Sequence, residues 1–170
     1  DSKTPMLKAQ HPDFEAWSDS VHADAGVTCV DCHMPYMRKD GQKYTSHWMT
    51  NPLHTTQESC MKCHDESAET LKARVQTIGD NTFKLQRIAG QTVAKAHLTV
   101  KAAMDAGATD EQLAAARLTL REAQWYWDWV AAESSMGFHN PSKMMRTLGL
   151  SIDKAHQVIE MTNAVMKGSL

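Results

Sequence analysis

The second half of the chain has a helical pattern of apolar residues. Apolar side chains there recur at steps of three and four residues, as at Leu71, Val75 and Ile78, which is the spacing of one face of an α-helix. Gly107 is a residue typical of a helix end. We therefore predict one long helix over about residues 66–105.

Two further helices are predicted by their start signals. Thr109-Asp110-Glu111-Gln112 has the residues of a capping box, and the helix that it opens should end near Gly137. Asn140-Pro141 combines an N-cap residue with proline at the first helical position, and so opens a third helix. No segment alternates convincingly with the two-residue period of a strand. The prediction is an all-α chain whose residues 66–170 form three long helices.

Residues 1–65 have a different composition. Pro, Gly, Asp, His and Met are frequent here, and only His11–Trp17 has a short helical signal, with Pro12 suited to a first turn. We expect a loop-rich segment over residues 1–65. With residues 66–170 it should form one continuous domain that is part of a larger protein.

All four cysteines lie in two motifs of identical spacing. Cys29-Val30-Asp31-Cys32-His33 and Cys60-Met61-Lys62-Cys63-His64 both have the pattern C-x-x-C-H. Two thiols one helical turn apart can bind the two vinyl groups of one porphyrin, and the histidine that follows can ligate its iron. The motifs therefore predict two covalently attached c-type haems in the loop-rich segment.

Two other uses of these cysteines are less consistent with their spacing. Zinc ribbons usually place about 15–20 residues between their C-x-x-C knuckles, whereas the stretch from Cys32 to Cys60 is longer. A zinc ribbon also needs no histidine directly after each knuckle. A disulfide within C-x-x-C is typical of redox-active sites rather than of structural cross-links.

Composition supports haem and argues against nucleic acid as a partner. Aromatic residues make up 6% of the chain and its mean hydropathy is −0.48, so covalent porphyrins would supply apolar volume that the side chains lack. The formal net charge of −2 and the lack of a basic run argue against nucleic acid as a partner. No apolar run approaches the roughly 20 residues of a membrane span. No signal peptide is seen, and the abrupt start at Asp1 suggests a mature fragment.

Seven histidines lie outside the two motifs, and a low-spin haem needs a second axial ligand. His22 and His47 lie near loops of the haem-binding segment, and His139 directly precedes the cap of the third helix. These three are candidate ligands. We interpret the others with weaker contexts as structural, namely His54, His97 and His156.

The long helices also contain more apolar positions than a small haem-binding half can cover. Methionine and aromatic residues at helical spacing are typical of core or interface. Trp125, Tyr126, Trp127 and Trp129 cannot share one helix face, so haem or a partner helix should contact this turn from several sides.

Several segments resemble one family closely. These are Lys8-Ala9-Gln10-His11-Pro12-Asp13-Phe14-Glu15-Ala16-Trp17 with His22, the first haem motif with Met34-Pro35, and Tyr44-Thr45-Ser46-His47. They resemble the C-terminal half of the periplasmic pentahaem cytochrome c nitrite reductases, which form ammonia. Residues 101–109, Gln124-Trp125-Tyr126-Trp127-Asp128 and Gly137-Phe138-His139-Asn140-Pro141 extend the resemblance over essentially the whole chain.

The resemblance implies roles for individual residues. His33 and His64 match proximal ligands of the family's fourth and fifth haems, with His139 and His22 as their respective distal ligands. His47 matches the distal ligand of the second haem, whose attachment motif is not in this chain. The residues that match the catalytic pocket are His11, which would bind nitrite, and Gln10 and Lys8, which would bind calcium through a side-chain and a backbone oxygen.

The resemblance also implies a setting for the protein. The family reduces nitrite to ammonium with six electrons, works in the periplasm, and forms a homodimer through its C-terminal helices. Its electron donor would be a membrane-anchored multihaem cytochrome that oxidises quinol.

The chain departs from the family in one respect. The catalytic haem of these enzymes is attached by a C-x-x-C-K motif, and none is present here. The catalytic iron is therefore expected upstream of this fragment. Three alternatives stay open: part of a longer enzyme, a stand-alone dihaem electron-transfer cytochrome, or a zinc-binding or purely structural helical module.

Overall fold

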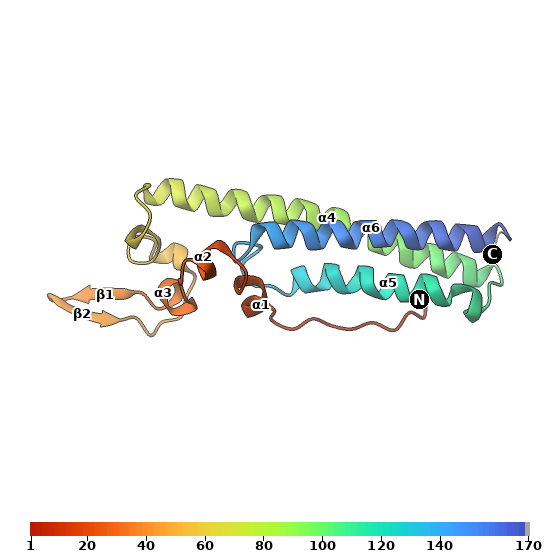
Figure 1. The fold of residues 1–170 in the computed structure, drawn as a ribbon, viewed down its shortest axis with the longest axis horizontal. Coiled ribbons are helices and arrows are strands. Elements are labelled where there is room, and N and C mark those ends of the chain that lie inside the picture. The colour runs from red at the N-terminus through yellow and green to blue at the C-terminus, as the bar shows by residue number, and fades with distance from the viewer. Residues whose placement is uncertain (169–170) are drawn as a thin grey trace.

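Three long helices form most of the molecule in the computed structural model, which describes residues 1–168. They are α4 (Ala68–Asp105), α5 (Asp110–Ala131) and α6 (Pro141–Met166), and they lie side by side along the long axis (Figure 1). Both α4 and α5 pack against α6. The predicted all-α class and the three long helices are confirmed, together with their order along the chain.

The starts of these helices follow from local capping. Ser67 Oγ accepts the N–H of Thr70 at the start of α4. The predicted capping box of Thr109 and Gln112 is present, and Asn140 Oδ1 accepts the N–H of Lys143. Each side chain satisfies an N–H group that has no partner within its helix.

The predicted end of α5 near Gly137 is wrong, because the helix ends at Ala131. The Glu133 carboxylate accepts the N–H groups of Ser135 and Gly137, which would otherwise bond to helix carbonyls. Met136 and Gly137 then have positive φ angles of 52° and 89°, which lie outside the helical region. The chain therefore turns before it enters α6.

The bundle has a continuous apolar core. Leu113 and Leu120 of α5 are fully buried with Val100 of α4 and Val158 of α6 in one cluster. A second cluster around Met144 and Leu148 also includes Ala16 of the N-terminal segment. Trp127 packs against both clusters and donates its indole N–H to the carbonyl of Gln86 at 3.1 Å.

From about residue 12 onwards, the loop-rich segment lies at one end of this bundle (Figure 1). It contains the short helices α1 (Asp13–Trp17), α2 (Val21–Asp24) and α3 (Cys29–His33). The 3₁₀ turns η1 (Pro52–His54) and η2 (Cys60–Lys62) follow. The short helix expected within His11–Trp17 is thus present as α1.

A small β-hairpin was not predicted. Strand β1 (Tyr36–Lys39) pairs with β2 (Gln42–Thr45) in antiparallel register, with Tyr36 opposite Thr45. Asp40 and Gly41 link them with φ angles of 50° and 79°. An Asp-Gly pair with two positive φ angles is a frequent hairpin turn, so this dipeptide was the signal that could have revealed the hairpin.

The first eight residues run along α5 and are held to the bundle by polar contacts. Ser2 Oγ lies 2.8 Å from Nδ1 of His97 on α4. Arg117 and Arg121 of α5 donate to the carbonyl oxygens of Ser2 and Pro5. The anchored residues lead to α1 at the end of the bundle (Figure 1).

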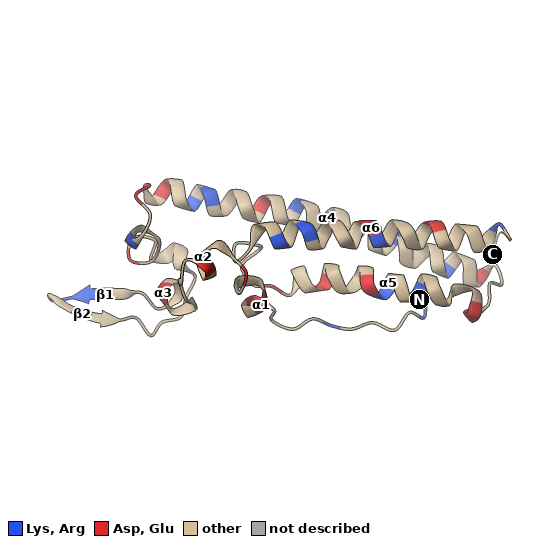
Figure 2. Cartoon of the chain, viewed as in Figure 1, with Lys and Arg blue, Asp and Glu red and all other residues tan. Residues whose placement is uncertain are grey.

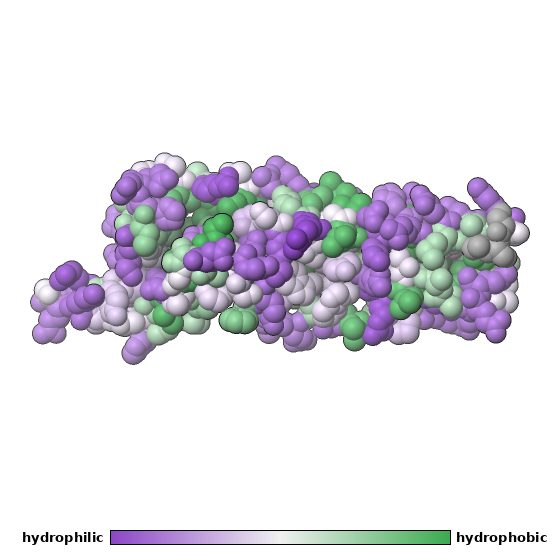
Figure 3. All heavy atoms as spheres, viewed as in Figure 1, coloured by the Kyte–Doolittle hydropathy of each residue, from purple (hydrophilic) through white to green (hydrophobic). Residues whose placement is uncertain are grey.

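The surface of the bundle is mixed in character. Acidic and basic residues alternate along the long helices without forming a block of one sign (Figure 2). Apolar residues also reach the surface between polar ones (Figure 3). Phe83, Ile88 and Leu98 of α4 are exposed. None of the helices within residues 1–168 is long and apolar enough to cross a membrane.

Candidate haem sites and the His11 segment

The first cysteine motif forms helix α3. Asp31 accepts the backbone N–H of Thr28 at 2.8 Å and its hydroxyl at 2.6 Å, which fixes the first turn of this helix. Cys29 and Cys32 therefore stand one turn apart, and both are free thiols. The predicted spacing for attachment to one porphyrin is present in the backbone.

The second motif forms the 3₁₀ turn η2 and the two residues after it. Ser59 Oγ donates to the carbonyl of Thr55 at 2.7 Å and holds the turn that leads into Cys60. Cys60 and Cys63 are also free thiols. Burial raises the pKa of the Cys32 thiol, and the nearby Cys60 thiol adds to this shift, so the two motifs are neighbours in space.

His33 of the first motif faces His139 from the turn before α6. The ring centres of His33 and His139 are 6.4 Å apart. His33 Nδ1 lies 2.9 Å from the carbonyl oxygen of Thr50, and His139 Nδ1 lies 2.6 Å from Oε1 of Glu133. Because each Nδ1 has an oxygen partner, each Nε2 is left available to a metal ion.

His64 of the second motif pairs with His22 in the same way. Their ring centres are also 6.4 Å apart, and the rings are nearly perpendicular. His22 lies on α2 and packs against the ring of Phe138, with 5.7 Å between the ring centres. Burial lowers the pKa of His22, and His64 and His139 nearby lower it further.

The spacing of both pairs fits a shared metal ion. Imidazole nitrogens bind transition metals at about 2 Å, so an ion between two facing imidazoles separates the ring centres by about 6 Å. Two pairs with this spacing each combine a C-x-x-C-H histidine with a histidine distant in sequence. The donor set suits haem iron with two imidazole ligands.

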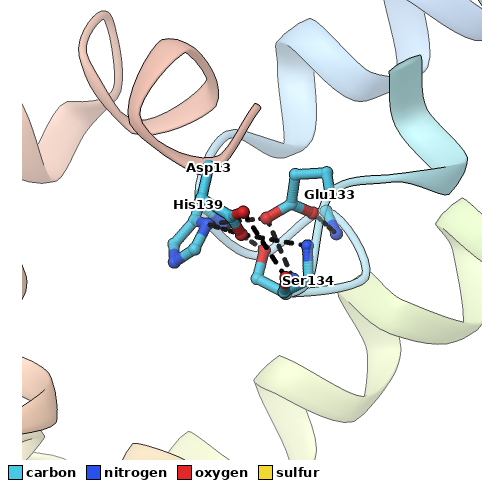
Figure 4. A network of polar contacts seen from close by, with 6 residues as sticks. Asp13, Glu133, Ser134 and His139 are labelled. Atoms are coloured by element: carbon cyan, nitrogen blue, oxygen red, sulfur yellow. Dashed lines mark hydrogen bonds and ion pairs between the residues drawn. The ribbon is translucent and has the colours of Figure 1, made fainter. Parts of the chain in front are cut away.

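A carboxylate that sequence analysis missed supports one of these histidines (Figure 4). Glu133 is buried and accepts three hydrogen bonds, from His139 Nδ1 and from the N–H groups of Ser135 and Gly137. Asp13 also approaches, with Oδ1 3.7 Å from His139 Nδ1, and accepts the N–H of Ser134. No local sequence signal marks Glu133, apart from its place in the turn before His139.

The charges of this network are mutually stabilising. Burial raises the pKa of Glu133, but the hydrogen bonds from His139, Ser135 and Gly137 outweigh burial and bring the pKa below its usual value. The same contact with Glu133 raises the pKa of His139. Glu133 is therefore an anion that orients the His139 ring.

The predicted catalytic residue His11 follows a segment that is held to α5 by Asp128. Buried Asp128 accepts the N–H of Ala9 at 2.6 Å and pairs with Lys8 Nζ at 2.8 Å. His11 itself is exposed and has a φ of 47°, an uncommon conformation that often occurs at functional sites. Gln10 is exposed beside it. Asp128 is a second supporting residue that sequence analysis missed.

The remaining histidines lie apart from the two pairs. His47 is exposed in the loop after β2, and His54 stacks on Trp48 with ring centres 6.3 Å apart. His97 contacts Ser2 within the bundle, and His156 is exposed on α6. Structural roles for His54, His97 and His156 stay a prediction.

Comparison with known proteins shows similarity to c-type cytochromes that include nitrite reductases. The model of the cytochrome c552 family matches residues 1–169. A cytochrome c nitrite reductase subunit NrfA from Nitratidesulfovibrio vulgaris is 42% identical over 168 residues, which cover 94% of this chain and 32% of that protein. A cytochrome c-552 from Haemophilus influenzae is 45% identical over 158 residues, which cover 90% of this chain and 29% of that protein.

The fold has a close counterpart among solved structures. The catalytic subunit of the cytochrome c nitrite reductase from Desulfovibrio desulfuricans, a protein with two calcium sites, superposes with a TM-score of 0.89 at 39% identity. The match covers 95% of this chain and 35% of that one. The chain thus spans about a third of the length of these relatives.

Proposed function

The chain belongs to the cytochrome c552 family, and from this premise we propose that it is part of an ammonia-forming nitrite reductase and binds two electron-transfer haems. Cytochromes c carry haem c, and relatives that cover nearly the whole chain include a nitrite reductase subunit. The observation that carries the proposal is the 6.4 Å separation in both histidine pairs, each pair containing the histidine of a haem motif.

Each haem would be held by one motif and one distant histidine. Cys29, Cys32 and His33 would hold the first haem together with His139. The second would be held by Cys60, Cys63, His64 and His22. When bound, haem c accepts and donates single electrons at its iron. The protein residues would fix the ligands, exclude water and tune the potential.

His11 would act on nitrite rather than bind iron. Reduction of nitrite to ammonium takes up six electrons and eight protons, so an imidazole, which can both donate and accept a hydrogen bond, suits a role in substrate binding and proton relay. Calcium held by the Gln10 side chain and the Lys8 carbonyl would fix the same backbone that Asp128 holds. His47 would ligate a haem that is attached outside these residues.

The alternative function is that of a dihaem cytochrome that only transfers electrons. It would use the same histidine pairs but would give no role to His11, Gln10 and Lys8. The chain has no C-x-x-C-K motif, so turnover of nitrite would require a catalytic haem from residues beyond this chain. The similarity to nitrite reductases favours the enzyme.

The setting proposed for the enzyme is the periplasm, as a homodimer supplied by a membrane-anchored multihaem quinol-oxidising cytochrome. Support for a dimer through the long helices comes from the exposed Phe83, Ile88 and Leu98 of α4. A groove of about 420 Å³ also lies where α4 meets Trp127. Leu98→Glu should weaken the dimer in sedimentation, and a variant series at these positions that stays fully dimeric would exclude this interface.

Mass spectrometry after acid-acetone extraction tests the haem proposal directly. Because the haems are covalent, the polypeptide should retain two haem masses, whereas a bare peptide mass would refute the proposal. His22→Ala and His139→Ala should then each open one iron to carbon monoxide, while His156→Ala should not. Low-spin spectra that stay unchanged in both variants would contradict the ligand pairs.

Nitrite turnover in the full-length protein distinguishes a nitrite reductase from a cytochrome that only transfers electrons. His11→Ala should retain all haems and their low-spin spectra but lose most nitrite reduction, since it would remove a contact to substrate. His54→Ala, another exposed histidine of residues 1–65, should retain turnover. Full activity of the His11 variant would show that the active site is elsewhere.

A further inference from the structure

The two histidine pairs differ in the groups that contact their Nδ1 atoms. His33 Nδ1 faces a neutral oxygen, the carbonyl of Thr50. His64 Nδ1 lies 3.7 Å from Glu66, whose side chain is 57% exposed to solvent. His139 Nδ1, by contrast, lies 2.6 Å from Glu133, whose side chain has no exposure.

Glu133 is held rigidly in this position. Its Oε1 accepts the N–H of Ser135 at 2.9 Å, and its Oε2 accepts the N–H of Gly137 at 3.0 Å. The backbone N–H of His139 donates in turn to Ser135 Oγ at 2.8 Å. The carboxylate and the imidazole are thus fixed to the same short turn between α5 and α6, as Figure 4 shows.

A buried carboxylate on the outer nitrogen of a ligating imidazole has a known physical effect. It fixes the ring and makes the ligand a stronger electron donor, because part of the negative charge is shared through the hydrogen bond. It also places a poorly screened negative charge near the iron. Both effects stabilise ferric iron, which carries one more positive charge than ferrous iron.

We propose that Glu133 is a positioning residue that lowers the reduction potential of the haem held by His33 and His139. This inference rests on the proposed function, since it requires that haem. Reduction adds one electron to this iron and breaks no bond, so the fixed anion opposes it directly. Within residues 1–168, no buried carboxylate is hydrogen-bonded to His22 or His64, the ligands of the other haem, and Glu66 near His64 is exposed.

The experiment is a redox titration of the full-length haem-loaded protein, followed by electron paramagnetic resonance. Glu133→Gln keeps the size of the side chain and a hydrogen-bond acceptor but removes the charge. One haem should then titrate at a higher potential with altered low-spin g values, and the other haem potentials should stay in place. Glu66→Gln is the matched control and should move none of them.

Glu133→Asp provides the second test. It keeps the charge but shortens the side chain, so the same haem should titrate between the wild-type and Glu133→Gln values. If Glu133→Gln fails to load haem, Glu133→Asp decides: a raised potential of one haem supports the proposal, and a wild-type potential overturns it.

Two results would overturn the inference without touching the proposed function. One is a low-spin Glu133→Gln protein with wild-type potentials, and the other is an equal shift in Glu66→Gln. Failure of the proposed function would be distinct, because the wild-type polypeptide would then have no haem mass at Cys29 and Cys32.

Discussion

The helical bundle and the loop-rich segment are stabilised in different ways. The bundle buries large side chains such as Leu113, Leu120, Met144 and Leu148 completely. Among residues 1–65, all of them described, the buried apolar residues are small: Ala9, Pro12, Ala16 and Pro35. The bundle therefore has a protein core of its own, whereas the loop-rich segment has almost none.

This difference indicates what the haems would do for the fold. Phe14, Val21, Trp48 and Met49 are between 63% and 76% exposed, an unusual number of large apolar residues on a short segment. Two covalent porphyrins would give this segment the apolar surface that its sequence does not supply. Four experiments test this contrast.

Removal of all four thiols should give the largest difference in stability between the loop-rich segment and the bundle. In a variant with Cys29, Cys32, Cys60 and Cys63 replaced by Ser, amides of residues 18–65 should exchange rapidly with solvent, since no haem holds them. Amides in the core of α4, α5 and α6 should stay protected. Hydrogen exchange with mass spectrometry measures both, and equal protection of the segment with and without haem would show that the segment does not depend on haem for its fold.

Truncation of one core residue should show where the protein core lies. Leu120→Ala should lower the free energy of unfolding by about 2–5 kcal/mol, because it leaves a cavity in a fully buried site. Phe14→Ala, on the exposed side of α1, should change it by less than about 0.5 kcal/mol. Urea unfolding followed by circular dichroism measures both, and a similar cost at the two sites would refute a core confined to the bundle.

The turn between α5 and α6 joins the bundle to the haem-ligand histidine His139. Substitution of two glycines, one in this turn and one outside it, tests the role of the turn. Gly137 has a φ of 89°, and a Cβ there would meet Thr82 Oγ1 of α4. Gly107 has a φ of 94° but open space around it. Both changes to Ala should cost about 1–3 kcal/mol from the backbone conformation, and Gly137→Ala should cost more because Thr82 must move.

Thermal unfolding of the two glycine variants measures the difference between their losses of stability. Gly137 also donates its N–H to Glu133, so only the Gly137 variant should alter the low-spin spectrum of the haem at His139. Equal losses of stability and identical spectra would mean that the turn does not couple the bundle to the haem ligand.

The helices were predictable because their signals are local. Ser67, Thr109 and Asn140 each cap a helix through residues three positions away, so the sequence window contains the whole interaction. The hairpin also had a local signal in Asp40-Gly41. The end of α5 was misplaced because the Glu133 side chain competes with helix bonding, which residue types alone do not show.

The supporting carboxylates were not predictable for the opposite reason. Asp128 holds Ala9 across 119 positions in the chain, and Glu133 acts on His139 only because the turn folds back. The histidine pairs were expected from family resemblance rather than from the residues themselves. Spacing along the chain predicted two haems, but only the fold brings His22 to His64 and His139 to His33.

The smallest expected effect is a pH dependence within the bundle, at His97. Burial lowers the pKa of His97, and a hydrogen bond with Gln124 only partly opposes this. The folded pKa is therefore below the unfolded value of about 6.5, so the unfolded chain takes up the proton first as pH falls. This contribution to stability is complete above about pH 6.5 and is lost as pH falls towards the folded pKa.

Replacement of His97 by Gln should reduce this loss, since the neutral side chain cannot take up a proton. We expect the melting temperature of His97→Gln to fall less than that of the wild type between about pH 7.5 and about pH 5. His156→Gln, at an exposed position of α6, should follow the wild type. Because His97 lies far along the bundle from the histidine pairs and contacts Ser2, its effect should appear in the unfolding of the helices and leave the haem spectra unchanged. A wild-type pH profile in His97→Gln would show that protonation of His97 contributes nothing to the acid sensitivity of the bundle.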